Sequence, residues 1–148
     1  MRTMVGVLRD GSAAALAPQP GVADLQRLAR GAGDVPRVEV SLSADLGDLG
    51  PAVGAAIYRI AQESITNAVR HARQATRVEV RVSSDGDAVR LTVRDDGVAA
   101  PALRNPLGYG LVGMTERAML LGGSLAAGPG PDRGWTVDAV LPRTAAGR

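Results

Sequence analysis

Two short segments of alternating sequence, RVEVRV and VRLTVR, constrain the fold of this chain more than any other feature. They enclose SSDGDA, whose Asp-Gly pair is typical of a tight turn between antiparallel strands. Because apolar residues alternate with charged ones, each strand can bury one face and expose the other. Residues 77–94 are therefore predicted to form a β-hairpin with one buried face.

A long helix is predicted before this hairpin, from Pro51 to about Arg73. Proline suits the first turn of a helix, where its missing N–H leaves no hydrogen bond unmade. Apolar and small side chains recur along one arc of the helix, and polar side chains lie opposite. The arc consists of Ile57, Ile60, Ala61, Ser64, Ile65, Ala68 and Ala72.

The remaining segments add elements of both kinds. A short amphipathic helix is predicted at 22–33, a half-buried strand at 36–45, and a second helix at about 111–121 followed by two strands around a Gly/Pro turn. Residues 95–110 lack periodicity and are predicted to be a loop. This order predicts an α+β fold: a two-layer α/β sandwich with a mixed, mostly antiparallel sheet and helices on one face.

We expect one domain over residues 20–142, preceded by the last turns of a helix and a linker (1–19) and followed by a disordered tail (143–148). No apolar stretch approaches the ~20 residues that a membrane span needs. The first residues are too polar for a signal peptide.

Composition restricts the chemistry that the chain can perform. All 17 basic residues are arginine, cysteine is absent, and His71 is the single histidine. A P-loop lysine, a Schiff base, a cysteine nucleophile and the usual zinc ligand sets are thereby excluded. A bound metal would be a hard cation such as Mg²⁺, held by oxygen ligands and by the phosphates of a ligand. The scarcity of aromatic residues argues against nucleic acid as a partner.

Glu63 and Asn67 lie four residues apart, so one stands above the other on the long helix. They border the apolar arc, which predicts a position at a rim where the helix meets the sheet. A carboxylate and an amide on such a rim can bind Mg²⁺ or orient a water molecule. The alternative is a solvated glutamate beside a surface asparagine.

Two further segments carry candidate polar or flexible groups. Asp95 and Gly97 follow the second strand of the hairpin, so Asp95 is either a buried acceptor for an exocyclic amine or a turn cap. Gly108, Gly110 and Gly113 precede or begin a helix. There the backbone N–H groups can approach a phosphate, although a plain loop explains the same glycines.

Taken together and in this order, these motifs resemble the ATP-binding domain of bacterial sensor histidine kinases, of the nitrate/nitrite-sensor type. This domain has the Bergerat fold of the GHKL group, which includes Hsp90-type chaperones, type II topoisomerases and mismatch-repair ATPases. The matching segments are YRIAQESITNAVRHA, VRDDGVAA, GYGLVGMTERAMLLGGSL and GWTVDAVLP, within residues 20–142.

The resemblance implies roles for individual residues. Asn67 would coordinate Mg²⁺ on the triphosphate with Glu63 beside it, and both would serve catalysis. Asp95 would accept the adenine amino group, with Gly97 allowing close approach, and residues 98–107 would form a lid over ATP. Further nucleotide-binding positions would be Arg70, His71, Gly108, Tyr109, Gly110 and Leu111.

The chain departs from this family's pattern at three points. Ala99 stands where a second glycine is usual, and Trp135 stands where a threonine near adenine is common. Thr136 is one residue away and is not assigned that role. The motif that carries the phosphorylated histidine is absent, so His71 is expected to line the nucleotide pocket instead of accepting phosphate.

The resemblance predicts a protein histidine kinase fragment that binds Mg²⁺-ATP and presents the γ-phosphoryl group to a histidine on a separate dimerisation domain. Residues 1–19 would be the tail of a helix of that domain. A response regulator would be reached through the longer protein, and the isolated chain would be monomeric. Its location would be cytoplasmic, alone or as part of a membrane-bound sensor. The alternative is a noncatalytic, partner-binding module of the anti-sigma-factor type on the same fold.

Overall fold

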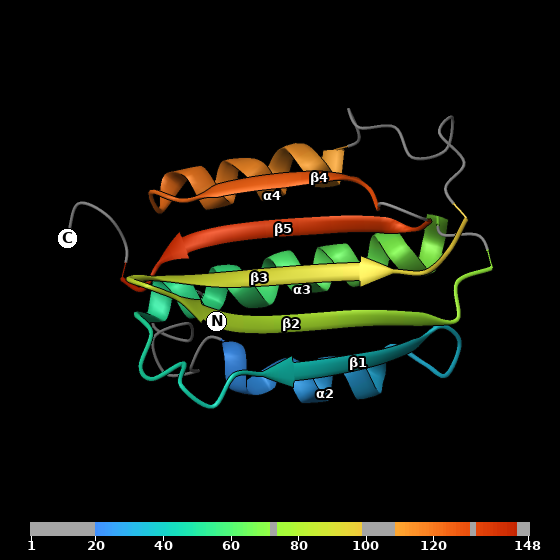
Figure 1. The fold of residues 1–148 in the computed structure, drawn as a ribbon, viewed down its shortest axis with the longest axis horizontal. Coiled ribbons are helices and arrows are strands. Elements are labelled where there is room, and N and C mark those ends of the chain that lie inside the picture. The colour runs from blue at the N-terminus through green and yellow to red at the C-terminus, as the bar shows by residue number, and fades with distance from the viewer. Residues whose placement is uncertain (1–19, 72–73, 99–108, 131–132, 145–148) are drawn as a thin grey trace, which may run out of the picture.

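The computed structural model describes residues 20–71, 74–98, 109–130 and 133–144. Five strands in these ranges form one sheet in the order β1-β2-β3-β5-β4 (Figure 1). Their bounds are β1 (Arg37–Leu42), β2 (Arg77–Asp85), β3 (Ala88–Asp95), β4 (Ser124–Pro129) and β5 (Trp135–Pro142). Only the β1–β2 pair is parallel among these strands, so the predicted mixed, mostly antiparallel sheet is confirmed.

The helices lie behind the sheet in Figure 1, on one of its faces. Their bounds are η2 (Val22–Asp24), a 3-10 helix, followed by α2 (Leu25–Gly31), α3 (Pro51–His71) and α4 (Tyr109–Leu120). The predicted two-layer sandwich is therefore confirmed. Several elements differ in extent from prediction. β1 is shorter than the predicted strand at 36–45, β2 continues to Asp85 through the first half of the expected turn, and α4 begins at Tyr109, within the expected loop.

The core lies between α3 and the sheet. The apolar arc of α3 is buried as predicted from Ile57 to Ala68, with Ile57, Ile60 and Ala61 at 0% exposure; its last predicted member, Ala72, lies outside the described residues. The sheet supplies the facing residues from alternate positions of its three central strands. These residues are Val78, Val80, Val82, Val89, Leu91, Val93, Val137, Ala139 and Leu141. Aliphatic side chains with few rotamers thus build the core that a chain without phenylalanine requires.

The opposite face of the sheet is polar and carries ion pairs between neighbouring strands. Arg90 of β3 donates two hydrogen bonds to Asp138 of β5, from Nε to Oδ1 at 2.9 Å and from Nη2 to Oδ2 at 2.6 Å. These bonds lower the pKa of the Asp138 carboxyl despite the opposing effect of its burial. The sheet therefore has one face for the helices and one for water, as alternating strands require.

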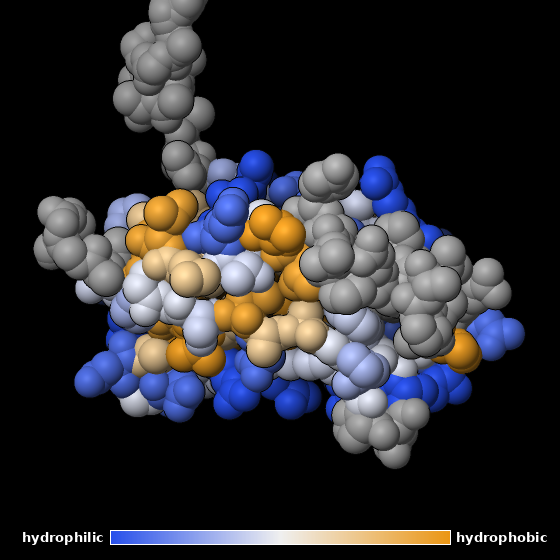
Figure 2. All heavy atoms as spheres, turned by 90° about the horizontal axis from the view of Figure 1, so that it is seen from above, coloured by the Kyte–Doolittle hydropathy of each residue, from blue (hydrophilic) through white to orange (hydrophobic). Residues whose placement is uncertain are grey.

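Apolar side chains also reach the surface along α4. Figure 2, which views the molecule from the side where β4 and α4 lie, shows apolar residues grouped between charged ones. On α4 itself Val112, Met119 and Leu120 are exposed. Within the part of the chain that the structure describes, no helix has the length and apolar character needed to cross a membrane.

This topology brings the ends of three helices and strands together at one end of the sandwich. The C-terminal end of α3, the C-terminal end of β3 and the N-terminal end of α4 all lie at the right of Figure 1. The residues singled out from the sequence are concentrated on these three ends. The predicted helical tail and linker at 1–19 fall outside the described residues, as does most of the predicted lid.

Candidate nucleotide-binding site

Glu63 and Asn67 of α3 face the first turn of α4 at Gly110. A Cβ atom added to Gly110 would lie 2.6 Å from Glu63 Oε2 and 3.3 Å from Asn67 Nδ2. Both distances are shorter than an ordinary van der Waals contact, so a side chain here would displace Glu63. The prediction placed the pair where α3 meets the sheet. The structure shows that the neighbour of this flank is helix α4.

A buried contact one turn along holds the two helices together. Ser64 and Met114 are 3% and 4% exposed, and the Ser64 hydroxyl donates a hydrogen bond to Met114 Sδ at 3.4 Å. Beside this contact lies a hollow of about 160 Å³ between α3 and α4. It is lined by Arg59, Gln62, Glu63, Gly110, Gly113, Met114 and Arg117. Glu63 is thus half-buried in a crevice with an arginine from each helix.

Asp95 ends β3 and is buried, with 4% of its surface exposed. Its Oδ1 accepts a hydrogen bond from the backbone N–H of Gly97 at 2.9 Å, so the chain turns back over the carboxylate. Gly97 is itself buried. A carboxylate has room for several hydrogen bonds, so the buried Asp95 is a candidate for accepting a further one from a ligand.

Asp96 fastens this strand end to the start of β2. Its Oδ1 accepts hydrogen bonds from the backbone N–H groups of Thr76, at 2.8 Å, and Arg77, at 3.1 Å. The Thr76 hydroxyl donates to Oδ2. Burial acts to raise the pKa of the Asp96 carboxyl, but these hydrogen bonds together outweigh it and lower the pKa. Asp96 therefore helps to position its neighbour Asp95.

Sequence reasoning missed one residue of this strand end, Gly134. Its φ is +85°, and a Cβ there would lie 1.9 Å from the carbonyl oxygen of Asp95, so only glycine fits. The available signal was a glycine directly before the last strand. Arg59 and Arg117 were also missed, because nothing in the spacing of either helix predicts that they flank the same hollow.

The other predicted site residues are distributed as follows. Arg70 is exposed near the end of α3, and Leu111 is half-buried against the core. His71 closes α3 and Tyr109 opens α4, but their side chains lie outside the described part of the chain. Gly108 also lies outside the described residues. The structure therefore brings Glu63, Asn67 and Gly110 together and places Asp95 and Gly97 at the same end of the fold.

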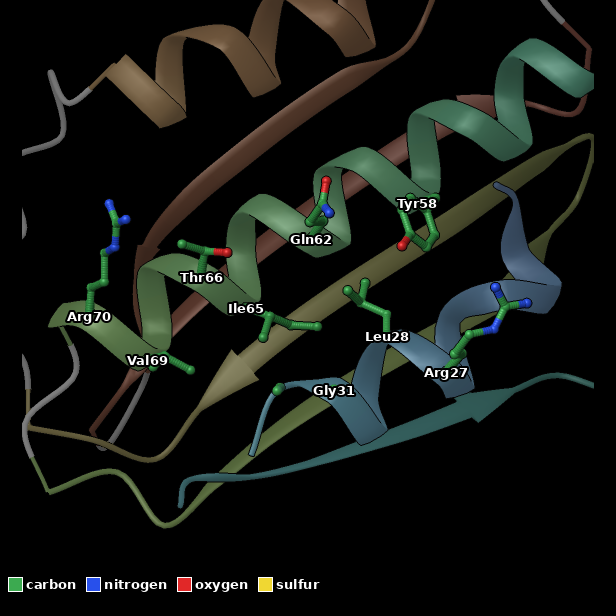
Figure 3. A pocket seen from close by; sticks show the side chains of 10 residues that line it. Arg27, Leu28, Gly31, Tyr58, Gln62, Ile65, Thr66, Val69 and Arg70 are labelled. Carbon is green, nitrogen blue, oxygen red and sulfur yellow. The ribbon is translucent and has the colours of Figure 1, made fainter. Parts of the chain in front are cut away.

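A separate groove of about 450 Å³ runs along the other flank of α3, where α3 faces α2 (Figure 3). Leu28, Ile65 and Val69 give it an apolar floor, and Arg27 and Arg70 stand at its ends. Arg27 is paired with Asp24 at 2.6 Å. Among the predicted nucleotide-site residues whose side chains are described, Arg70 alone lines this groove, which is distinct from the contact between Glu63 and Gly110.

Comparison with known proteins identifies the class. Residues 52–145 match the model of the family described as histidine kinase-, DNA gyrase B- and HSP90-like ATPases. The chain belongs to this family, which confirms the resemblance found in its motifs.

Within the family, the chain is similar to sensor histidine kinases. It is 39% identical over 92 residues to the sensor histidine kinase YxjM of Bacillus subtilis, covering 62% of this chain and 22% of that protein. It is 36% identical over 91 residues to a NarQ homolog of Haemophilus influenzae, covering 60% and 16%. This second match lends weak support to the nitrate/nitrite-sensor subfamily. The chain thus spans about a fifth of the length of these relatives.

The fold matches that of a solved ATP-binding domain. The ATP-binding domain of PrrB from Mycobacterium tuberculosis superposes with a TM-score of 0.61 at 25% identity, covering 82% of this chain and 93% of that one. The chain is therefore the counterpart of the ATP-binding domain of a sensor histidine kinase.

The hydrogen bonds to Asp96 make stability depend on pH. Because its pKa is lower in the folded state than in the unfolded chain, the stabilisation is present above the unfolded value of about 3.9 and is lost as pH falls through the folded pKa. We expect Asp96→Asn to be less stable than the parent at neutral pH and the difference to shrink in acid. Urea unfolding between neutral and strongly acidic pH measures this.

The exposed Asp34 provides the matched control, since Asp34→Asn should leave the pH dependence unchanged. A parent and an Asp96→Asn variant with parallel pH profiles would contradict the assignment.

Proposed function

We propose that this chain binds Mg²⁺-ATP and presents the γ-phosphoryl group for transfer to a histidine on a dimerisation domain outside the chain. One observation carries the proposal. Glu63 and Asn67 are held against Gly110 at the N-terminus of α4, at the same end of the fold as the buried Asp95. An oxygen-rich pair, a helix N-terminus and a buried carboxylate suit the three parts of such a ligand.

The base is assigned to the end of β3. The buried Asp95 carboxylate would accept a hydrogen bond from the amino group of adenine, and a base with a carbonyl oxygen at that place would be repelled. The N–H of Gly97 keeps the carboxylate oriented. Burial strengthens the preference, because a hydrogen bond to a carboxylate is stronger away from water than in solvent.

The phosphates are assigned to the N-terminus of α4, where unpaired N–H groups and the helix dipole favour an anion. Gly110 keeps this turn open toward α3. Arg70 and His71 at the end of α3, and Gly108, Tyr109 and Leu111 around the start of α4, are proposed as further nucleotide contacts.

The possible oxygen ligands around Asn67 suit a metal ion that binds together with the triphosphate. Among the described residues, no group of three or more His, Cys, Asp or Glu could hold a metal ion by itself. Asn67 would supply one oxygen ligand, and Glu63 would orient a water molecule of the metal ion. A site with so few protein ligands suits Mg²⁺, because Mg²⁺ usually takes most of its ligands from water and from the phosphates of a substrate. When bound, Mg²⁺ neutralises charge on the transferring phosphoryl group.

The protein's part in the transfer is positioning. Asp95 would fix the base, α4 would fix the phosphates, and Asn67 and Glu63 would hold the γ-phosphoryl end at the surface between α3 and α4. Such alignment accounts for most of the catalysis in phosphoryl transfer, because little covalent chemistry falls to the protein.

The acceptor histidine and the response regulator would be reached through a longer protein. In that protein, residues 1–19 would continue a helix of the dimerisation domain, residues 20–142 would be the ATP-binding domain on the cytoplasmic side, and residues 143–148 would be a tail. The intact set of Glu63, Asn67, Asp95 and Gly110 argues against the noncatalytic alternative, since a module that no longer bound nucleotide would not need these residues.

Nucleotide binding by two variants should distinguish the proposed base-binding role of Asp95 from the proposed metal-binding role of Asn67. We expect Asp95→Asn to weaken ATP binding about 10- to 100-fold with or without Mg²⁺, because a hydrogen bond to a charged group is worth ~1.5–3 kcal/mol. Asn67→Ala should weaken binding in Mg²⁺ and have little effect in a chelator. Titration calorimetry of both variants measures this, with Thr66→Ala on the neighbouring flank of α3 as control. Parent-like binding by both variants would refute the site.

The tight contact at Gly110 offers a second test. Gly110→Ala should push Glu63 away and weaken Mg²⁺-ATP binding, since its Cβ would lie 2.6 Å from Glu63 Oε2. Gly113→Ala is the matched control, because a Cβ there meets nothing within 4 Å, and alanine should stabilise the helix by up to about 1 kcal/mol. If the two variants bind ATP equally, the contact does not shape the site.

Phosphoryl transfer distinguishes a kinase domain from a binding module. When a separately purified dimerisation domain with its acceptor histidine is added, we expect labelled phosphate from ATP to appear on that domain. The label should be acid-labile, and Asn67→Ala should abolish its transfer. Binding of ATP without transfer would favour the noncatalytic alternative.

A further inference from the structure

We infer that Trp135 forms one wall of the base site and that its indole contacts the purine ring of the bound nucleotide. This inference rests on the proposed function and adds to it a residue that selects for a flat aromatic base.

The sheet places Trp135 directly beside Asp95. The two residues are register partners in the antiparallel β3–β5 pair, as are Thr136 and Arg94 one step along. Directly opposite residues of an antiparallel pair have their side chains on the same face of the sheet, about 4.5–5.5 Å apart at Cβ. Trp135 therefore stands next to the carboxylate that is proposed to bind the base.

The alternation of side chains along β5 shows on which face of the sheet Trp135 lies. Val137 and Ala139 are buried under the helices, so Trp135, two residues before Val137, lies on this same face. The indole is half-buried and packs at the edge of the core. Thr136 lies on the opposite, polar face with Arg94. Thr136 consequently cannot reach a base beside Asp95, and Trp135 is the residue of β5 that can.

The backbone before Trp135 is fixed against Asp95. Gly134 has a φ of +85°, and no Cβ could fit there because it would lie 1.9 Å from the Asp95 carbonyl oxygen. On its other side Trp135 pairs with Pro129 of β4. The backbone of Trp135 is thus held between Asp95 of β3 and Pro129 of β4.

The chemistry of the pair favours a purine. A buried carboxylate can bind the edge of a base through one donor, but it offers nothing to the faces of the ring. An indole supplies a large apolar surface with few rotatable bonds, and stacking of a base on an aromatic side chain changes affinity by about 5- to 150-fold. Together Asp95 would read the amino edge of adenine and Trp135 would contact its ring.

The single tryptophan of the chain makes this contact directly observable. We expect Mg²⁺-ATP to change the Trp135 emission saturably, with the same dissociation constant as in calorimetry, and to protect the indole from acrylamide quenching. Mg²⁺-tripolyphosphate, which has the phosphates without the base, should leave the emission and the quenching unchanged. Calorimetric saturation by Mg²⁺-ATP without any change in emission or quenching would overturn the inference while leaving nucleotide binding intact.

Substitution tests the same contact by affinity. Trp135→Leu should weaken binding of ATP and ADP by a similar factor, about 5-fold or more, since stacking on the base is common to both ligands. Trp135→Phe keeps an aromatic ring and should stay within about threefold of the parent. Thr136→Ala, on the opposite face, is the control.

The outcomes separate this inference from the proposed function. Parent-like ATP binding by Trp135→Leu, together with weakened binding by Asn67→Ala, would refute the role of Trp135 alone. Absence of ATP binding by the parent would refute the proposed function itself. Thermal melting monitors the folding of each variant, and the emission of the parent protein decides the question if Trp135→Leu does not fold.

Discussion

The packing of helix α3 on the central strands is the interaction on which the rest of this structure depends. Among the described elements, the other helices pack against α3 or against the edges of the sheet. The contact is made by isoleucine, valine, leucine and alanine, since the chain contains no phenylalanine. Branched aliphatic side chains pack closely with few rotamers, so a dense aliphatic interface holds α3 at one height and rotation above the sheet.

The two flanks of α3 differ in polarity. The flank toward α4 carries Glu63 and Asn67 and closes on a glycine, while the flank toward α2 carries Ile65 and Val69 and borders a wider, more apolar groove. Ser64 lies between the core and the flank toward α4, where its hydrogen bond to Met114 links α3 to α4. A single amphipathic helix thus supplies a core face, a polar crevice and an apolar groove.

Much of this arrangement could be predicted because it depends on local periodicity. The hairpin of β2 and β3 and the buried arc of α3 follow from alternation and helical spacing, and the fold follows from the order of the elements. Two kinds of feature could not be predicted. Parallel pairing of β1 with β2 joins strands that are distant in the chain. The facing of Glu63 toward Gly110 and the hydrogen bonds of Asp96 to Thr76 depend on how separate elements meet, which no local pattern encodes.

The hydrogen bonds of Asp96 have a consequence for the dimensions of the site. They hold Thr76 and Arg77 against the end of β3, and only four residues separate Thr76 from the end of α3 at His71. The number of residues between Asn67 and Thr76 therefore helps to set the distance between the end of α3 and the end of β3, the two ends that carry the proposed metal-binding and base-binding residues. An insertion or deletion there would alter the span between Asn67 and Asp95 without changing either residue. In the proposed site, the length of nucleotide that fits would thus depend on a short connecting segment as well as on the side chains proposed to contact it.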